Sequence, residues 1–157
     1  MKNVKKWMSV FLCGLILLVS AACSQEEAKN PKAADVVDDL REAIEFPEMA
    51  EQSVEDLTAY GYDLTADDVE DMCFILAGSG ITADEVFVVK LTDASKADSV
   101  MDMMAARRDM IKETAADYTP EETEKLTTAV IGSKGAYVYY AATNDNAKAK
   151  EILSSAF

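Results

Sequence analysis

The chain has 157 residues, with 29 acidic against 15 basic side chains, a net charge of −14 and no histidine. So negative a surface repels nucleic acid, which argues against a nucleic-acid partner. The lack of histidine removes the Ser–His and Cys–His nucleophile pairs and the commonest ligand of transition metals. The composition therefore predicts no catalytic residues, no cofactor and no metal site, and it favours a binding or accessory protein over an enzyme.

The first 22 residues have the layout of a secretory signal peptide. A basic start with three lysines precedes an apolar run at 7–19, shorter than the ~20 residues that a permanent transmembrane helix needs. Small residues at 20–22 lead into Cys23 in the manner of a lipobox, although Ser20 stands where lipoboxes favour leucine. We expect cleavage before Cys23 and acylation of its thiol, with palmitate as a typical chain. The alternatives are a signal peptide with an incidental cysteine and an uncleaved signal anchor.

These signals divide the chain into a signal peptide (1–22), a lipidated cysteine with a disordered tether (23–32) and a single acidic α+β domain (33–157). The tether is too poor in apolar residues to pack, and its nine residues after the cysteine reach at most ~30 Å when extended. Removing the signal peptide with its three lysines leaves a net charge of −17. We expect a protein on the outer face of the cell membrane, held there by acyl chains.

The domain opens with helical signals. Apolar residues at helical spacing predict a helix at 33–46. The segments 53–56 and 65–68 each place a hydroxyl three residues before an acid, a variant of the capping box. These boxes predict two short helices on either side of a turn at 60–63.

The middle of the chain changes to strand character. Apolar and β-branched runs predict strands at 73–77 and 86–91. Cys73 begins the first of these runs, so we expect a buried thiol that behaves as a small apolar side chain. A long helix is expected from 93 to about 115, because its apolar residues recur at helical spacing.

The last third repeats this order. A capping hydroxyl and a proline predict a short helix from Thr119 onward. Strands at 129–131 and 136–142 are separated by a turn at 132–135, and 144–146 caps a final helix. An offset of 52 residues aligns the two strand–turn–strand–helix units. The predicted fold is therefore α+β: two ββα units form a four-stranded, mainly antiparallel sheet with both of their helices on one face, preceded by the N-terminal helices.

Both faces of the predicted strands are apolar, so the second face of the sheet must be covered. One account places the N-terminal helices, residues 33–72, across it. The other is a tyrosine patch formed by Tyr137, Tyr139 and Tyr140 that binds a partner or a second copy, because large exposed apolar patches mark interaction sites.

The chain resembles a domain-of-unknown-function family of uncharacterised lipoproteins of clostridia and related Gram-positive bacteria. The resemblance covers about residues 33–157 and follows the lipobox-like start. It is carried by the segments Tyr60-Gly61-Tyr62-Asp63, Val86-Phe87-Val88-Val89-Lys90-Leu91, Tyr118-Thr119-Pro120-Glu121, Tyr137-Val138-Tyr139-Tyr140 and Asn144-Asp145. It implies an outward-facing Gram-positive membrane lipoprotein and supplies no catalytic residue.

These observations predict a membrane-anchored surface lipoprotein that acts as a non-enzymatic binding or accessory module for a protein or small ligand. The alternative is a cell-surface hydrolase that uses two carboxylates, because such enzymes need only Asp and Glu side chains. A cleft flanked by two carboxyl groups would favour the hydrolase, and a flat exposed patch would favour the binding module.

Overall fold

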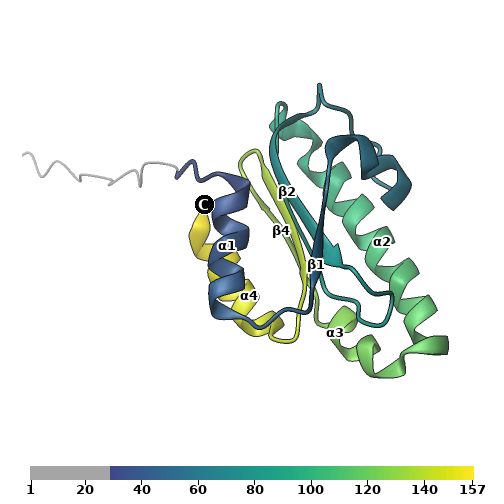
Figure 1. Cartoon of the computed structure of the whole chain (residues 1–157). Coiled ribbons are helices and arrows are strands. Elements are labelled where there is room, and N and C mark those ends of the chain that lie inside the picture. Colours follow the sequence, from purple (N-terminus) through teal and green to yellow (C-terminus); the bar gives the residue numbers. More distant parts are fainter. Residues whose placement is uncertain (1–28) are drawn as a thin grey trace, which may run out of the picture.

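The computed structural model describes residues 29–157, so the predicted signal peptide and Cys23 lie outside the described residues. A five-stranded antiparallel sheet in the order β1-β2-β3-β5-β4 separates two helical layers (Figure 1). Its strands are β1 (Met49–Gln52), β2 (Val69–Ala77), β3 (Glu85–Leu91), β4 (Val130–Lys134) and β5 (Tyr137–Ala142). Among the described residues, no helix is long and apolar enough to cross a membrane.

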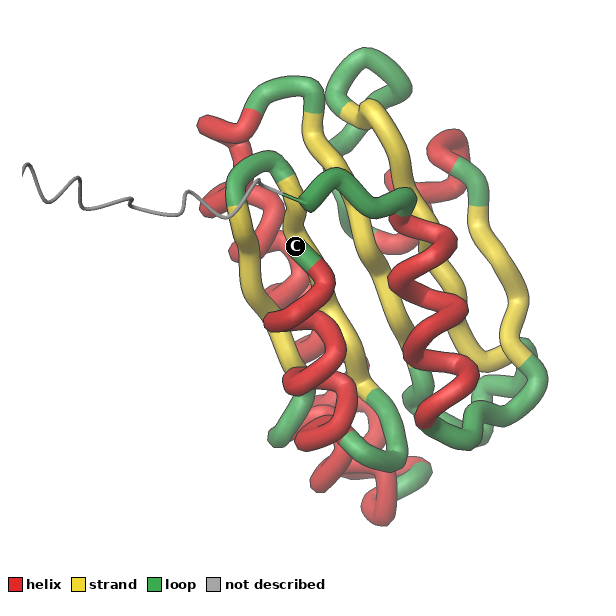
Figure 2. The backbone as a smooth tube through the Cα atoms, turned by 90° about the vertical axis from the view of Figure 1, so that its left-hand side faces the viewer, coloured by secondary structure: helices red, strands yellow, loops and turns green. Residues whose placement is uncertain are grey.

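The helices divide between the two faces of the sheet. One layer consists of α1 (Ala33–Ala43) and α4 (Asn146–Ala156), which lie side by side across the strands in Figure 2. The other layer holds α2 (Ala97–Tyr118), with the short helix α3 (Thr123–Thr127). Three 3₁₀ helices complete the fold: η1 (Val54–Tyr60), η2 (Ala94–Lys96) and η3 (Pro120–Glu122).

Each face of the sheet has its own hydrophobic core. Leu57 of η1 and Met104 of α2 pack with Phe74 and Phe87 on the first face. Val37 of α1 and Leu153 of α4 belong to the core on the second face, where they pack with Ile75, Val86 and Val88. The continuous apolar runs of β2 and β3 follow directly from this arrangement, because a strand buried on both faces has no solvent side.

Most of the predicted elements are confirmed. The helix at the start of the domain, both strands of each pair, the long helix and the final helix are all present. Asp93 and Asp145 cap the elements that follow β3 and β5, accepting the backbone N–H of Ser95 and Lys148 at 2.9 Å. Cys73 is buried, as its apolar surroundings predict.

The second of the two short N-terminal helices is absent, and this prediction was wrong. Asp68 accepts hydrogen bonds from the Thr65 amide (3.0 Å) and hydroxyl (2.8 Å), but the segment is a turn and β2 begins at Val69. The capping-box contacts therefore close an isolated turn. The backbone of Asp68 accepts the Thr92 amide, so the chain continues into sheet pairing with β3 instead of into a helix.

The strand count was also too low. The edge strand β1 was missed because four residues with two polar members carry too little alternating pattern to be recognised.

The predicted turn at 132–135 is shifted as well. β4 continues to Lys134, which pairs with Tyr137, and the two-residue loop begins at Gly135 with a φ of 61°. A positive φ at the first loop residue is typical of hairpins and is readily adopted by glycine.

The helices of the two predicted ββα units, α2 and α4, lie on opposite faces of the sheet, not on one face as predicted. β3 pairs with β5 in the register Phe87 to Tyr140, so these two residues share a face. The 52-residue repeat aligns Phe87 with Tyr139 instead, and Tyr139 points to the other face. A shift of one residue reverses the face of every side chain, so the repeat does not place its two helices on the same face. α2 lies over β4 and β5 on the first face, and α4 lies over the same two strands on the second face.

The second face is covered by α1 together with α4, so the prediction that the N-terminal helices cover it holds for α1 alone. Leu57 places η1 on the α2 face. Tyr137 and Tyr140 are buried and Tyr139 is half-buried, so these three tyrosines do not form an exposed patch on this chain. Tyr140 faces α2 and the other two face α4, because neighbouring residues of a strand alternate in direction.

Candidate functional site

Two adjacent carboxylates, Asp84 and Glu85, are buried where β3 begins. Their exposed fractions are 1% and 3%, although most acidic side chains of the described residues lie at the surface. Buried charges are costly unless they are paired and hydrogen-bonded. Each of these carboxylates has a cation supplied by a different helix, so the start of β3 is the strongest polar feature of the described fold.

Glu85 is paired with Arg107 of α2. The guanidinium donates from Nε and Nη2 to the two carboxylate oxygens, each at 2.6 Å, which is a bidentate arrangement. Its Nη1 donates to the carbonyl of Tyr60 at 3.2 Å, and its plane lies over the Tyr60 ring at 4.9 Å. Burial raises the pKa of Glu85, while the hydrogen bonds from Arg107 oppose that rise. The pair connects η1, β3 and α2 across the first core.

Two tyrosine hydroxyls lie beside this ion pair. The Tyr62 hydroxyl donates to Glu85 at 3.5 Å, a long contact, and the buried Tyr140 hydroxyl has no partner among the described residues. Burial is the main cause that raises the pKa of both phenols, and the Glu85 charge adds to it. Both hydroxyls therefore stay protonated at neutral pH and serve as polar edges of the core.

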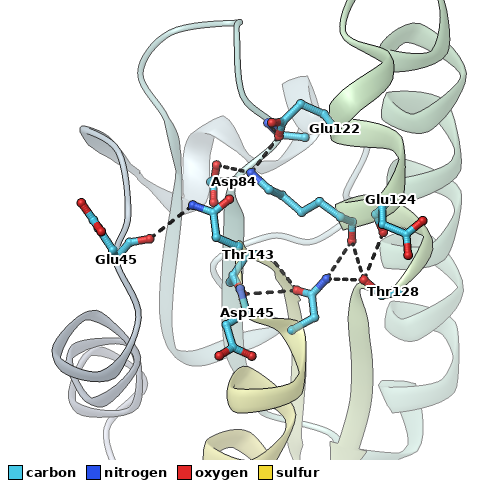
Figure 3. A network of polar contacts seen from close by, with 11 residues as sticks. Glu45, Asp84, Glu122, Glu124, Thr128, Thr143 and Asp145 are labelled. Atoms are coloured by element: carbon cyan, nitrogen blue, oxygen red, sulfur yellow. Dashed lines mark hydrogen bonds and ion pairs between the residues drawn. The ribbon is translucent and has the colours of Figure 1, made fainter.

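Asp84 is held by Lys125 of α3 in a network that Figure 3 draws from close by. The Lys125 ammonium contacts Asp84 at 2.6 Å and Glu122 at 2.7 Å. Glu122 also accepts the amide of Ala83 at 2.9 Å, so its carboxylate ties η3 to the loop before β3. The pKa of Glu122 is lowered overall, because these hydrogen bonds and the Lys125 charge outweigh the effect of burial.

Asn146 extends this network to the start of α4. Its side-chain amide donates to the Lys125 carbonyl at 2.8 Å and to the Thr128 hydroxyl at 2.9 Å. Its carbonyl accepts the backbone N–H of Thr143 at 2.8 Å. The loop before β3, α3 and the N-terminus of α4 are thus joined by a single set of polar contacts, shown in Figure 3.

The two buried ion pairs are better explained by a structural role than by a role in proton transfer. A general acid or base must reach a substrate, whereas Asp84 and Glu85 are buried and each is opposed by a cation. Asp39 and Glu42 do line a shallow groove between α1 and α4, but the groove's described lining contains no aromatic ring to hold a sugar. This groove therefore lacks the aromatic lining that a two-carboxylate glycosidase needs.

The end of the domain where β3 begins, which holds Asp84 and Glu85, also exposes large apolar side chains. Ile81, in the loop between β2 and β3, is 70% exposed, and Tyr118, at the end of α2, is 81% exposed. Met110 is also exposed, at 54%, but it lies about two turns earlier on α2 and so outside this end. The Ala83–Glu122 hydrogen bond holds the loop of Ile81 against η3, which follows Tyr118 directly. In Figure 1 this end lies below, opposite the point where the chain enters α1.

The sequence-predicted and observed sites differ. Cys23 lies outside the described residues, and the predicted tyrosines lie on the inner strand β5 and pack into the two cores. Asp84, Glu85 and their cations were missed because the composition of the chain does not distinguish a buried acid from the many exposed ones. The available signal was the position of Asp84-Glu85 directly before an apolar strand.

A family model described as a domain of unknown function (DUF4358) matches residues 42–143. The match spans all five strands, α2 and α3, and it includes both buried ion pairs. No curated protein and no solved structure matches the chain.

Proposed function

We propose that this chain, which belongs to the DUF4358 family of domains of unknown function, is a lipid-anchored binding module on the outer face of a Gram-positive cell membrane. In this proposal Cys23 carries the acyl chains and residues 24–32 form a short tether. The domain then presents its far end, the surface formed by Ile81, Tyr118 and Pro120, to a protein partner. We call this surface the distal tip.

The observation that carries the proposal is the location of exposed apolar side chains at the distal tip. Ile81 and Tyr118 are the two most exposed large hydrophobic side chains of the described residues, and the Ala83–Glu122 hydrogen bond joins the segments on which they lie. Exposed apolar groups that gather at one place mark interaction sites. The tip faces away from the tether. In a protein anchored to the membrane, the end farthest from the anchor is the one that partners beyond the membrane can reach.

The charges around the distal tip indicate the chemistry of the partner. Asp117, Glu121 and Glu124 are exposed beside Tyr118 along the end of α2, η3 and α3. An aromatic and aliphatic surface bordered by carboxylates complements a partner that combines apolar side chains with Lys or Arg. A sugar hydrolase is less well supported, because the buried acids at this end are already paired with Lys125 and Arg107.

The proposal is tested with the intact protein in its own membrane. Mass spectrometry of the peptide that contains Cys23 reports acylation, and an unmodified cysteine would contradict the anchor. Chemical cross-linking on whole cells then identifies neighbours of the wild-type domain and of an Ile81→Ser/Tyr118→Ser variant. We expect one reproducible partner to be lost from the variant.

The matched control is Met110→Ser, which also removes an exposed apolar side chain from α2 but lies eight residues before Tyr118, about 12 Å along the helix. This control should retain the partner, and all three proteins should show equal amounts in the membrane fraction. Equal cross-linking by the tip variant and the wild type would refute the role of the tip. Turnover of wall fragments by the purified protein would instead support the hydrolase.

A further inference from the structure

The opposite end of the domain, where the chain enters α1, concentrates lysines around an aromatic surface. Lys29, Lys90 and Lys134 line a cavity of about 400 Å³, which we call the lysine–aromatic site. Its other lining residues are Asn30, Gly135, Ala136, Tyr137 and Phe157. They come from the end of the tether, the β4–β5 hairpin and the C-terminal end of α4, which lie together in Figure 1.

Aromatic stacking builds the floor of this site. The Phe157 ring stacks on Tyr137 at 4.5 Å and on Tyr139 at 5.6 Å between centroids. The Tyr137 hydroxyl donates at 2.8 Å to Asn30 and to the Pro31 carbonyl, which fixes the end of the tether against the sheet. The site is therefore a formed surface, and the segment leading to Cys23 is part of its wall.

The three lysines surround these rings. The Lys90 ammonium lies 5.8 Å from the Tyr137 ring centroid, and the Lys134 ammonium donates to the Phe157 carbonyl. Lys29 donates to the carbonyl of Ser155 at 2.7 Å. Lys90 is paired with Glu70, whereas Lys29 and Lys134 make no ion pair with a carboxylate side chain of the described residues.

The cluster of three lysines contrasts with the net negative charge of the domain. Residues 29–157 hold 27 acidic and 12 basic side chains, once the three lysines and two glutamates before residue 29 are left out. Three of those twelve cations line a single cavity. A membrane with anionic lipids repels the domain as a whole, and these three lysines are cations placed where the tether enters the domain.

We propose that the lysine–aromatic site binds the phosphate headgroup of an anionic phospholipid in the membrane that holds the anchor. This inference rests on the proposed acylation of Cys23, which stands six residues before Lys29 and so within about 20 Å of it. Three lysines that line one cavity suit the headgroup region, where ammonium groups meet anionic phosphates. The stacked rings of Tyr137 and Phe157 are themselves buried and support this cavity from below. Binding there orients the domain and points the distal tip away from the membrane.

The test uses the intact protein reconstituted in vesicles of phosphatidylcholine alone or with phosphatidylglycerol. Lysine acetylation is quantified at each position by mass spectrometry, and the same digest reports whether Cys23 is acylated. We expect acetylation of Lys29 and Lys134 to fall about fivefold in the anionic vesicles, the effect of a lysine at an anionic surface. Lys112 on α2 and Lys150 on α4 serve as references and should not change.

A charge-matched pair of variants separates the site from general electrostatics. Lys90 lines the same cavity, so its acetylation should also fall in anionic vesicles. Lys29→Gln/Lys134→Gln should abolish this protection of Lys90, while Lys112→Gln/Lys150→Gln should leave it intact. Equal acetylation of Lys29 and Lys134 in neutral and anionic vesicles overturns the proposal. Protection by soluble inorganic phosphate at the same concentration also overturns it in favour of a free-phosphate site. An unmodified Cys23 overturns the proposed lipid anchor but not the headgroup site. In that case the lysine labelling still reports whether the unanchored protein binds anionic lipid.

Discussion

The buried ion pair of Glu85 and Arg107 makes the sharpest prediction about stability, tested by Arg107→Met. The arginine side chain is 10% exposed and that of Glu85 is 4% exposed, so the substitution leaves a carboxylate in the core without its cation. Removing one partner of such a pair costs about 3–5 kcal/mol in the free energy of unfolding. Methionine fills much of the arginine volume, so the loss reports the charge more than the packing.

The neighbouring residue provides a matched control. Arg108 lies next on the same helix and pairs with Asp109, but the side chains are 28% and 61% exposed. Surface pairs contribute about 0–1 kcal/mol, so Arg108→Met should have little effect. Urea unfolding followed by far-ultraviolet circular dichroism at pH 7.5 measures both variants. A loss below about 1 kcal/mol for Arg107→Met would refute the reasoning, because a buried uncompensated carboxylate costs more.

The pH dependence of the same variant provides a second readout. Burial raises the pKa of Glu85, so the folded state holds its proton more tightly than the unfolded chain. The stability from this group is present below the unfolded pKa of about 4.3 and is lost as pH rises through the folded pKa. Without Arg107 the folded pKa rises further, so Arg107→Met should regain stability relative to wild type when the pH falls from 7.5 to 5. A pH-independent difference would contradict this explanation.

Three further predictions concern single residues. Gly132→Ala should displace the half-buried Tyr139 ring and destabilise the domain by about 1 kcal/mol in urea unfolding, because its new Cβ would lie 2.6–2.7 Å from the outer atoms of that ring. Burial raises the pKa of Cys73 to about 11, so Ellman's reagent at pH 8 should react far more slowly with folded than with urea-unfolded protein; equal rates would contradict burial. Asn146→Ala should cost about 1–3 kcal/mol, since the Thr143 amide loses its acceptor, whereas Asn146→Asp should retain part of that stability in the same assay.

Local patterns in the sequence predicted the elements whose signals are self-contained. The strand at 86–91 and the caps at Asp93 and Asp145 depend only on nearby residues, and all are present. The apolar character of both strand faces likewise predicted that the second face would be covered, and α1 and α4 cover it. The turn at Thr65–Asp68 was mispredicted because the same capping contacts close either a helix or an isolated turn.

The candidate site could not be predicted in the same way. The Glu85–Arg107 pair joins residues 22 positions apart, and the Asp84–Lys125 pair joins residues 41 positions apart. In a chain with 29 acids, the local signal for the two that become buried is their position directly before an apolar strand, and that signal does not identify their cations. The distal tip is also a tertiary feature, because the Ala83–Glu122 hydrogen bond that joins the loop of Ile81 to η3 links residues 39 positions apart.

The sequence by itself determined the acidic composition, the order of strands and helices, and the pattern that makes Cys23 a predicted lipid anchor. Only the tertiary structure decided on which face each helix lies, because the pairing of Phe87 with Tyr140 sets that face and a shift of one residue would reverse it. It also decided which charges are buried, since burial depends on the α2 and α3 cations that reach the start of β3. Local propensity acts within a few residues, whereas strand register and ion pairing are settled by contacts between distant parts of the chain.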